Sequence, residues 1–260
     1  MKHSALGLMI LLASVWLAAC TTTSSGGPTL AKEETEAEKA GTLNKQLGTV
    51  YLRQGNLALA KEKLERAEKY NPRDPEIHSV LALLYARLDI PKEVDSHYKT
   101  AIRLAPNNPG ILNNYAVYLC KNGRTDEGVK RFLEAAKNPL YRTPEAAYTN
   151  AGVCLREAKK LDDASTSFKR ALSIAPNSAE AVYQLADLDR ERGQLAPARE
   201  LIDKFLTTNE ATADILGLGA RLARAQNDRV GEEKYMRRLR VEFPGSEQLR
   251  ALTEQKRNPG

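Results

Sequence analysis

The prolines of this chain recur at a spacing that few folds can accommodate. Pro72 and Pro106 lie 34 residues apart, and Pro176 and Pro244 lie 68 apart, which is twice 34. Pro106 and Pro176 are separated by 70 residues, two more than twice 34. Each of these prolines follows, by five residues, an alanine or leucine suited to close a helix. A period of 34 predicts helix-turn-helix units stacked in a row.

The period divides the chain into six frames: 41–74, 75–108, 109–142, 145–178, 179–212 and 213–246, with two extra residues at 143–144. The eighth position of every frame is small: Gly48, Ala82, Ala116, Gly152, Ala186 and Ala220. A small side chain there lets the two helices of a unit approach closely. The turn between them holds Gly55, Gly123 and Gly193, where a left-handed residue is needed. We therefore predict an all-α, right-handed superhelix of six tetratricopeptide repeats, with a C-terminal capping helix in 247–260.

The first twenty residues differ from the rest of the chain. A basic start is followed by a short apolar run that ends in Leu17-Ala18-Ala19-Cys20. We expect residues 1–19 to be a lipoprotein signal peptide and Cys20 to be acylated, although an ordinary signal peptide with a chance cysteine gives a similar pattern. Thr21, in place of the aspartate that retains lipoproteins in the inner membrane, indicates a periplasm-facing anchor in the outer membrane. Residues 20–40 form the expected tether, and acidic residues near its end could extend the first repeat helix into it.

Composition argues against several functions. The net charge is +6, from 39 basic and 33 acidic residues, and the basic residues form no stripe with interleaved aromatics, so we expect no nucleic-acid partner. His78 and His97 belong to no metal or triad motif, and a packed or solvated side chain is the simpler interpretation of His97. No phosphate-binding loop is present. We expect no enzyme activity, no cofactor, no metal and no small-molecule substrate.

Two cysteines remain besides Cys20. Cys120 and Cys154 fall in the second halves of first helices in adjacent repeats, so they can meet and form a disulfide in an oxidising compartment. Two separately buried thiols are the alternative.

The concave face of a tetratricopeptide row is formed by positions five, nine and twelve of each first helix. On this basis the candidate partner-binding groove comprises Thr49, Leu52, Leu83, Ala86, Asn113, Val117 and Val153. An apolar, partly exposed groove suits an amphipathic or extended protein segment. The alternative is that neighbouring helices simply cover these side chains.

Several segments lie outside the generic repeat pattern. They are Leu112-Asn113-Asn114-Tyr115 through Cys120, Asn138-Pro139-Leu140-Tyr141 and Gly152-Val153-Cys154. With Cys20 and the six repeats, they resemble the type IV pilus biogenesis lipoproteins of the PilF and PilW family, the pilotins of the pilus secretin. One departure is Ala116, where that family usually has glycine. The resemblance implies a pilotin that helps the secretin reach the outer membrane and form its multimer. A general scaffold of envelope assembly, serving outer-membrane proteins or peptidoglycan machinery, is the alternative.

Overall fold

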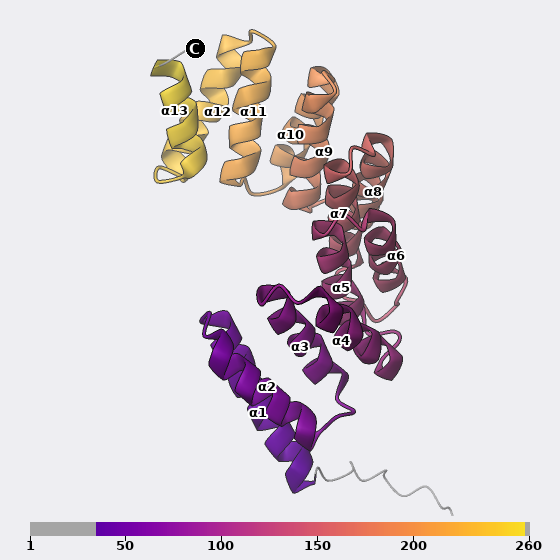
Figure 1. Cartoon of the computed structure of the whole chain (residues 1–260). Coiled ribbons are helices and arrows are strands. Elements are labelled where there is room, and N and C mark those ends of the chain that lie inside the picture. The colour runs from indigo at the N-terminus through magenta and orange to yellow at the C-terminus, as the bar shows by residue number, and fades with distance from the viewer. Residues whose placement is uncertain (1–34, 258–260) are drawn as a thin grey trace, which may run out of the picture. The chain divides into compact units, whose positions relative to one another are not determined.

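The computed structural model describes residues 35–257, so the expected signal peptide, Cys20 and most of the tether lie outside the described residues. Within this range the chain forms thirteen helices and no strand (Figure 1). The helices are α1 (Glu36–Arg53), α2 (Leu57–Tyr70), α3 (Pro75–Arg87), α4 (Pro91–Leu104), α5 (Pro109–Lys121), α6 (Thr125–Ala136), α7 (Pro144–Glu157), α8 (Leu161–Ile174), α9 (Ala179–Glu191), α10 (Leu195–Thr208), α11 (Ala213–Ala225), α12 (Arg229–Glu242) and α13 (Glu247–Arg257). The predicted all-α tetratricopeptide fold is confirmed.

Local chemistry explains where the helices begin and end. Both α2 and α4 stop two residues before a proline, Pro72 and Pro106, because the residue before a proline disfavours helical geometry. The next helix then begins with another proline at its first position, preceded by a side chain that caps the free backbone N–H groups. Asp74 accepts from the N–H of Glu76 in this way at the start of α3. A proline followed by a capped helix start therefore separates the first repeat from the second and the second from the third.

The turn inside each repeat requires a left-handed residue. Gly55, Gly123 and Gly193 have φ between +74° and +77°, as expected. The other three repeats place Asp89, Lys159 and Asn227 at the same position, with φ between +55° and +62°. Those three residues carry a Cβ in a conformation that favours glycine.

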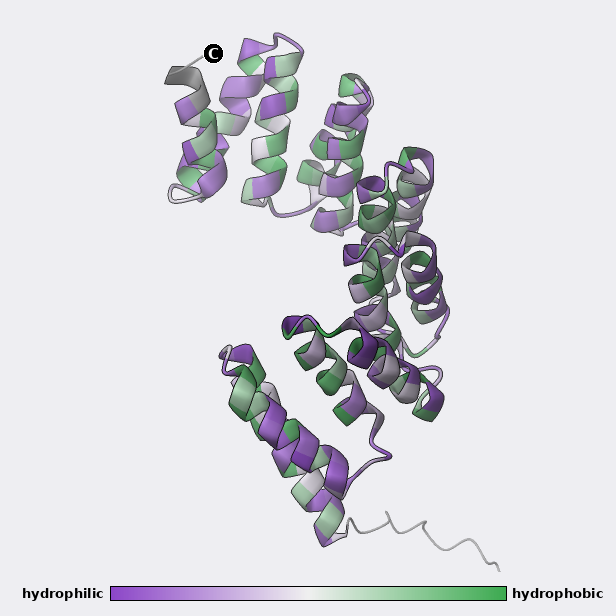
Figure 2. Cartoon of the chain, viewed as in Figure 1, coloured by the Kyte–Doolittle hydropathy of each residue, from purple (hydrophilic) through white to green (hydrophobic). Residues whose placement is uncertain are grey.

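The core runs between the helices of each pair and on into the next pair. Leu64, Tyr98, Phe132, Phe168 and Ile202 are fully or almost fully buried. They lie at equivalent positions of successive second helices. Figure 2 shows hydrophobic and hydrophilic bands on every pair, as expected for helices that bury one face only.

The small eighth position is where these large side chains need room. A Cβ built on Gly48 would lie 2.6 Å from Cγ of Leu64, and one on Gly152 would collide with the ring of Phe168. The large side chain of a repeat's second helix thus explains why the eighth position, on the first helix, is small.

The two ends of the repeat array differ. At the C-terminal end α13 buries Leu252 against the cluster of α11 and α12, so this helix caps the last repeat. At the other end Leu43, Leu47 and Val50 of α1 are 56%, 39% and 45% exposed. In the later repeats the equivalent positions are buried, except for Tyr118, which is partly buried.

The structure corrects the expected tether, 20–40, at its end. Residues 36–40 form the first turn of α1 because Thr35 and Glu38 make a reciprocal capping box: the Thr35 hydroxyl accepts from the N–H of Glu38, whose carboxylate accepts from the N–H of Thr35. Among the helices of the described residues, none is long and apolar enough to cross a bilayer.

Candidate partner-binding groove

A continuous apolar groove runs across the first helices of the first three repeats, α1, α3 and α5. It consists of two adjoining hollows of about 680 and 490 Å³. Both hollows are lined by Thr49, Arg53, Val80, Leu83 and Asn114. Since these five residues are shared, the hollows form one surface, which we call the groove.

Apolar side chains from several elements form the wall of the groove. Leu52 comes from α1, Leu83 from α3, Val94 from α4 and Val117 from α5. Leu83 is 37% exposed, so a bound segment can cover it. An open apolar surface of this kind is where amphipathic helices or extended segments dock.

The margin of the groove is polar and carries charge. Arg53, Arg87 and Lys121 lie around the larger hollow, together with one carboxylate, Asp89. In the smaller hollow Lys45 Nζ lies 2.8 Å from a carboxylate oxygen of Asp74 and 2.7 Å from one of Glu76. Burial lowers the pKa of Lys45, but the hydrogen bonds from these two carboxylates outweigh it, so the net pKa is raised. Lys45 is therefore a charged cross-link between the first two repeats.

Five of the seven residues expected in the groove line it: Thr49, Leu52, Leu83, Ala86 and Val117. Asn113 does not line either hollow, because its amide oxygen faces α7 and accepts from Asn150 Nδ2 at 3.2 Å. Val153 lies elsewhere too, packed against the core cluster that contains Phe168. Sequence reasoning also missed the sixth position of each first helix, which supplies Val80 and Asn114. That position was the available signal, and it faces the groove because it lies three residues before the ninth, on the same face of the helix.

A charged network occupies the corresponding surface in the fourth and fifth repeats. Arg156 on α7 donates to Asp187 Oδ2 at 2.6 Å and to Glu191 Oε1 at 2.5 Å, both on α9. Arg190 donates to the other oxygen of Asp187 at 2.8 Å. Burial raises the pKa of Asp187, but the hydrogen bonds from the two arginines outweigh it and hold the pKa below its ordinary value. The surface here is therefore occupied by paired charges.

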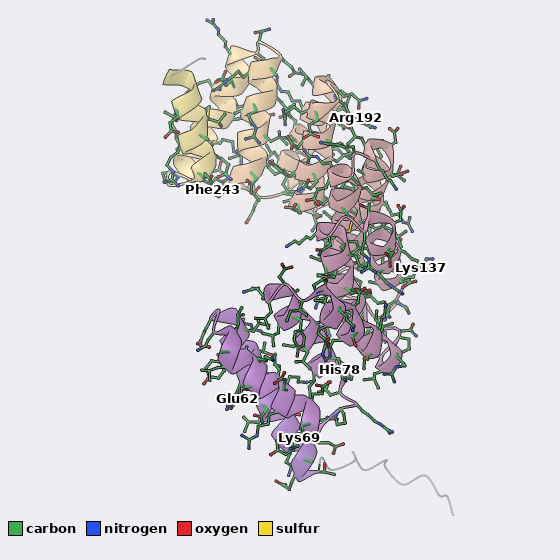
Figure 3. The ribbon with its side chains drawn as sticks, in the orientation of Figure 1. Glu62, Lys69, His78, Lys137, Arg192 and Phe243 are labelled. Carbon is green, nitrogen blue, oxygen red and sulfur yellow. A yellow bond between two sulfur atoms is a disulfide. The ribbon has the colours of Figure 1, made fainter. Side chains whose placement is uncertain are left out.

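Cys120 on α5 and Cys154 on α7 are joined by a disulfide, with Sγ–Sγ at 2.03 Å and Cα–Cα at 5.6 Å (the yellow bond in Figure 3). The Cα separation lies within the usual range of disulfides, about 4.4–6.8 Å. Gly128 on α6 leaves room for the Cys120 sulfur, with which any Cβ at that position would collide. The bond ties the third repeat to the fourth, beside the end of the groove.

The structure also brings together three residues that sequence reasoning left apart. His78 and His97 face one another through their Nδ1 atoms at 3.2 Å, and Glu68 lies beside both. His78 follows Glu68 by 10 residues and His97 follows His78 by 19, so no short sequence motif contains all three. Only the register of the folded repeats places α2, α3 and α4 around one point.

Stacked helix pairs with an apolar groove on one face define a tetratricopeptide-repeat protein, a class that binds other proteins. One tetratricopeptide repeat model matches residues 45–109 and 116–179, and two others match 97–130 and 155–222. The chain is 30% identical over 238 residues to type IV pilus assembly protein PilF of Pseudomonas aeruginosa, covering 92% of this chain and 94% of the relative. The chain thus belongs to the PilF family of tetratricopeptide-repeat proteins.

Solved structures of this family have the same fold. A structure of Pseudomonas aeruginosa PilF superposes with a TM-score of 0.64 at 29% identity, covering 85% of this chain and all of the other. The crystal structure of PilW, described as a widely conserved type IV pilus biogenesis factor, superposes with a TM-score of 0.64 at 28% identity, covering 83% of this chain and 99% of that one.

Proposed function

We propose that this protein is a scaffold of type IV pilus biogenesis, anchored in the outer membrane through acylated Cys20, that acts as pilotin for the pilus secretin. The family relation supports the pilus role, because the relatives named above are a pilus assembly protein and a pilus biogenesis factor. The lipobox sequence that ends at Cys20 supports the anchor and the periplasm-facing location.

The observation that carries the binding role is the groove itself. It combines an apolar wall with a basic margin, and it is built on helices whose own cores are filled. A rigid surface loses little conformational entropy when a partner binds. The groove therefore suits an apolar or amphipathic segment of the secretin that also carries acidic residues, and the protein acts by binding rather than by catalysis.

Substitutions in the anchor and in the groove separate the two parts of this proposal. In a strain that lacks the gene, we expect the wild-type chain to restore secretin multimers on an immunoblot. Cys20→Ser should leave the repeats folded and shift the protein away from the outer membrane. Leu83→Asp should leave fold and location unchanged but reduce multimers, since burial of an unpaired carboxylate by the partner costs several kcal/mol.

Leu140→Asp is the matched control for the groove. Leu140 is 85% exposed and lies in the turn between α6 and α7, outside the groove. This variant carries the same change in charge and should support normal multimers. Normal multimers with a folded and correctly located Leu83→Asp protein would refute the groove as the working surface, and unchanged location of Cys20→Ser would refute the anchor.

A further inference from the structure

Glu68, His78 and His97 converge from three helices, α2, α3 and α4, and so from the first two repeats. Their ligand atoms, Glu68 Oε1 and the two Nδ1 atoms, all lie within 4.8 Å of one another. Two imidazoles and a carboxylate are a common ligand set for zinc. We call these three residues the histidine cluster.

The distances within the histidine cluster match those around a single metal ion. Nδ1 of His78 lies 3.2 Å from Nδ1 of His97, and Glu68 Oε1 lies 3.5 Å from the first and 4.0 Å from the second. A point equidistant from these three atoms is about 2.1 Å from each, and zinc bonds to histidine nitrogen and carboxylate oxygen are about 2.0–2.2 Å long. One zinc ion can therefore contact all three atoms with little movement of the chain.

The hydrogen bonding of His78 directs its Nδ1 toward metal binding. Its Nε2 lies 2.8 Å from the carbonyl oxygen of Pro72. A carbonyl oxygen only accepts, so Nε2 carries the proton and donates it. In the neutral ring Nδ1 then holds a free lone pair, directed at the histidine cluster. An imidazole held by a backbone carbonyl on its far nitrogen is the usual arrangement of a zinc-binding histidine.

Packing holds the ring of His97 in place. The ring stacks on Tyr85, with centroids 5.3 Å apart and planes 10° from parallel, which restrains its orientation. Its Nδ1 faces Nδ1 of His78 across the histidine cluster.

The histidine cluster is enclosed on one side and open on the other. The side chains of His78 and His97 are 7% and 12% exposed, whereas that of Glu68 is 35% exposed. Glu68 therefore gives an ion access from solvent, and a water molecule can complete a tetrahedral set of ligands.

We propose that the histidine cluster is a zinc site that clamps the first repeat to the second. The alternative occupant of the same geometry is a proton, shared between two imidazoles that form a hydrogen-bonded pair with no metal. A zinc site binds added zinc through these three residues, whereas a hydrogen-bonded pair of imidazoles does not.

The test uses the full chain, purified in detergent and treated with a chelator, titrated with zinc chloride in a calorimeter. We expect one zinc ion per chain and a raised melting temperature. Cobalt chloride should give the visible absorption of a tetrahedral site. His97→Gln and Glu68→Gln should each weaken zinc binding at least tenfold. Glu68→Gln is the safer variant for folding, since Glu68 is partly exposed.

Glu62→Gln is the matched control, because Glu62 lies on the same helix, exposed, and pairs with Lys63 outside the histidine cluster (Figure 3). Zinc binding by this variant should equal that of the wild type. No heat of zinc binding in the wild type, or equal affinity in wild type, His97→Gln and Glu68→Gln, would overturn the proposal and leave the hydrogen-bonded pair.

Discussion

Leu47, Leu81 and Leu185 occupy the same position, the seventh, in the first, second and fifth repeats. Leu81 is fully buried against residues of the first repeat, and Leu185 is only 5% exposed against those of the fourth. Among the described residues no repeat precedes that of Leu47, which is 39% exposed. The same substitution, leucine to alanine, should therefore have very different effects at these three positions.

The expected loss of unfolding free energy follows from how deeply each leucine is buried. Removal of three buried carbon groups from Leu81 costs about 2.4 kcal/mol, at about 0.8 kcal/mol for each. A cavity of about 60 Å³ adds about 1.4 kcal/mol if the surroundings do not relax, so Leu81→Ala should lose about 3 to 4 kcal/mol. Leu185→Ala should lose nearly as much. Leu47→Ala opens no enclosed cavity, and we expect a loss of about 1 kcal/mol or less.

Chemical denaturation followed by circular dichroism measures these differences, and amide hydrogen exchange shows whether the loss is confined to the mutated repeat and its neighbours. Equal losses in Leu47→Ala and Leu81→Ala would refute the reasoning. That result would mean that α1 is covered in the folded protein as completely as α3 is.

Three further predictions concern single contacts. Lys159→Gly should stabilise the fold by about 0.5 to 1 kcal/mol in the same assay, because an exposed residue with φ of +62° gives way to the one that prefers it; a loss of stability would contradict this. Asp187→Asn should lose about 1 to 2 kcal/mol, since Arg156 and Arg190 lose a partly buried carboxylate while Glu191 still pairs with Arg156. The folded-state pKa of Asp187 is lowered, so its contribution should be complete above about pH 5, decline as the pH falls below about 4, and vanish below the folded-state pKa. A wild-type advantage as large at about pH 3 as at about pH 7 would contradict this. Thiol counts under denaturing conditions should rise by two on reduction of the Cys120–Cys154 bond, and reduction should destabilise the fold by about 3 to 4 kcal/mol; an unchanged count would exclude the bond in the exported protein.

The repeat architecture was accessible from sequence because it rests on local chemistry repeated many times. Pro72 and Pro106 each mark the end of the helix before them, and a small residue is needed opposite a large one, as Gly48 is opposite Leu64. The left-handed turn was only half predictable, since glycine marks it in three repeats while Asp89 and Lys159 tolerate the strain. Aspartate and asparagine adopt this conformation more readily than other non-glycine residues, so Lys159 is the one that goes against local preference.

The groove and the histidine cluster depend on how helices rotate about their axes, which a period of 34 does not specify. A rotation by one position exchanges Asn113 for Asn114 at the surface of the groove. The histidine cluster is harder still to predict from sequence, because its three residues come from three helices. Each of them alone resembles an ordinary helix residue. The early start of α1 agrees with the open alternative that acidic residues extend this helix, and the capping box at Thr35 fixes where it begins.

Site-specific photo-crosslinking in living cells tests most directly whether the groove holds the secretin. A photoreactive residue placed at position 83 of α3 should yield an adduct that contains the pilus secretin, whereas the same residue at exposed position 140 should yield none. Both proteins must be folded and located like the wild type. A secretin adduct at position 140 with none at position 83 would contradict the account and place the working surface outside the groove.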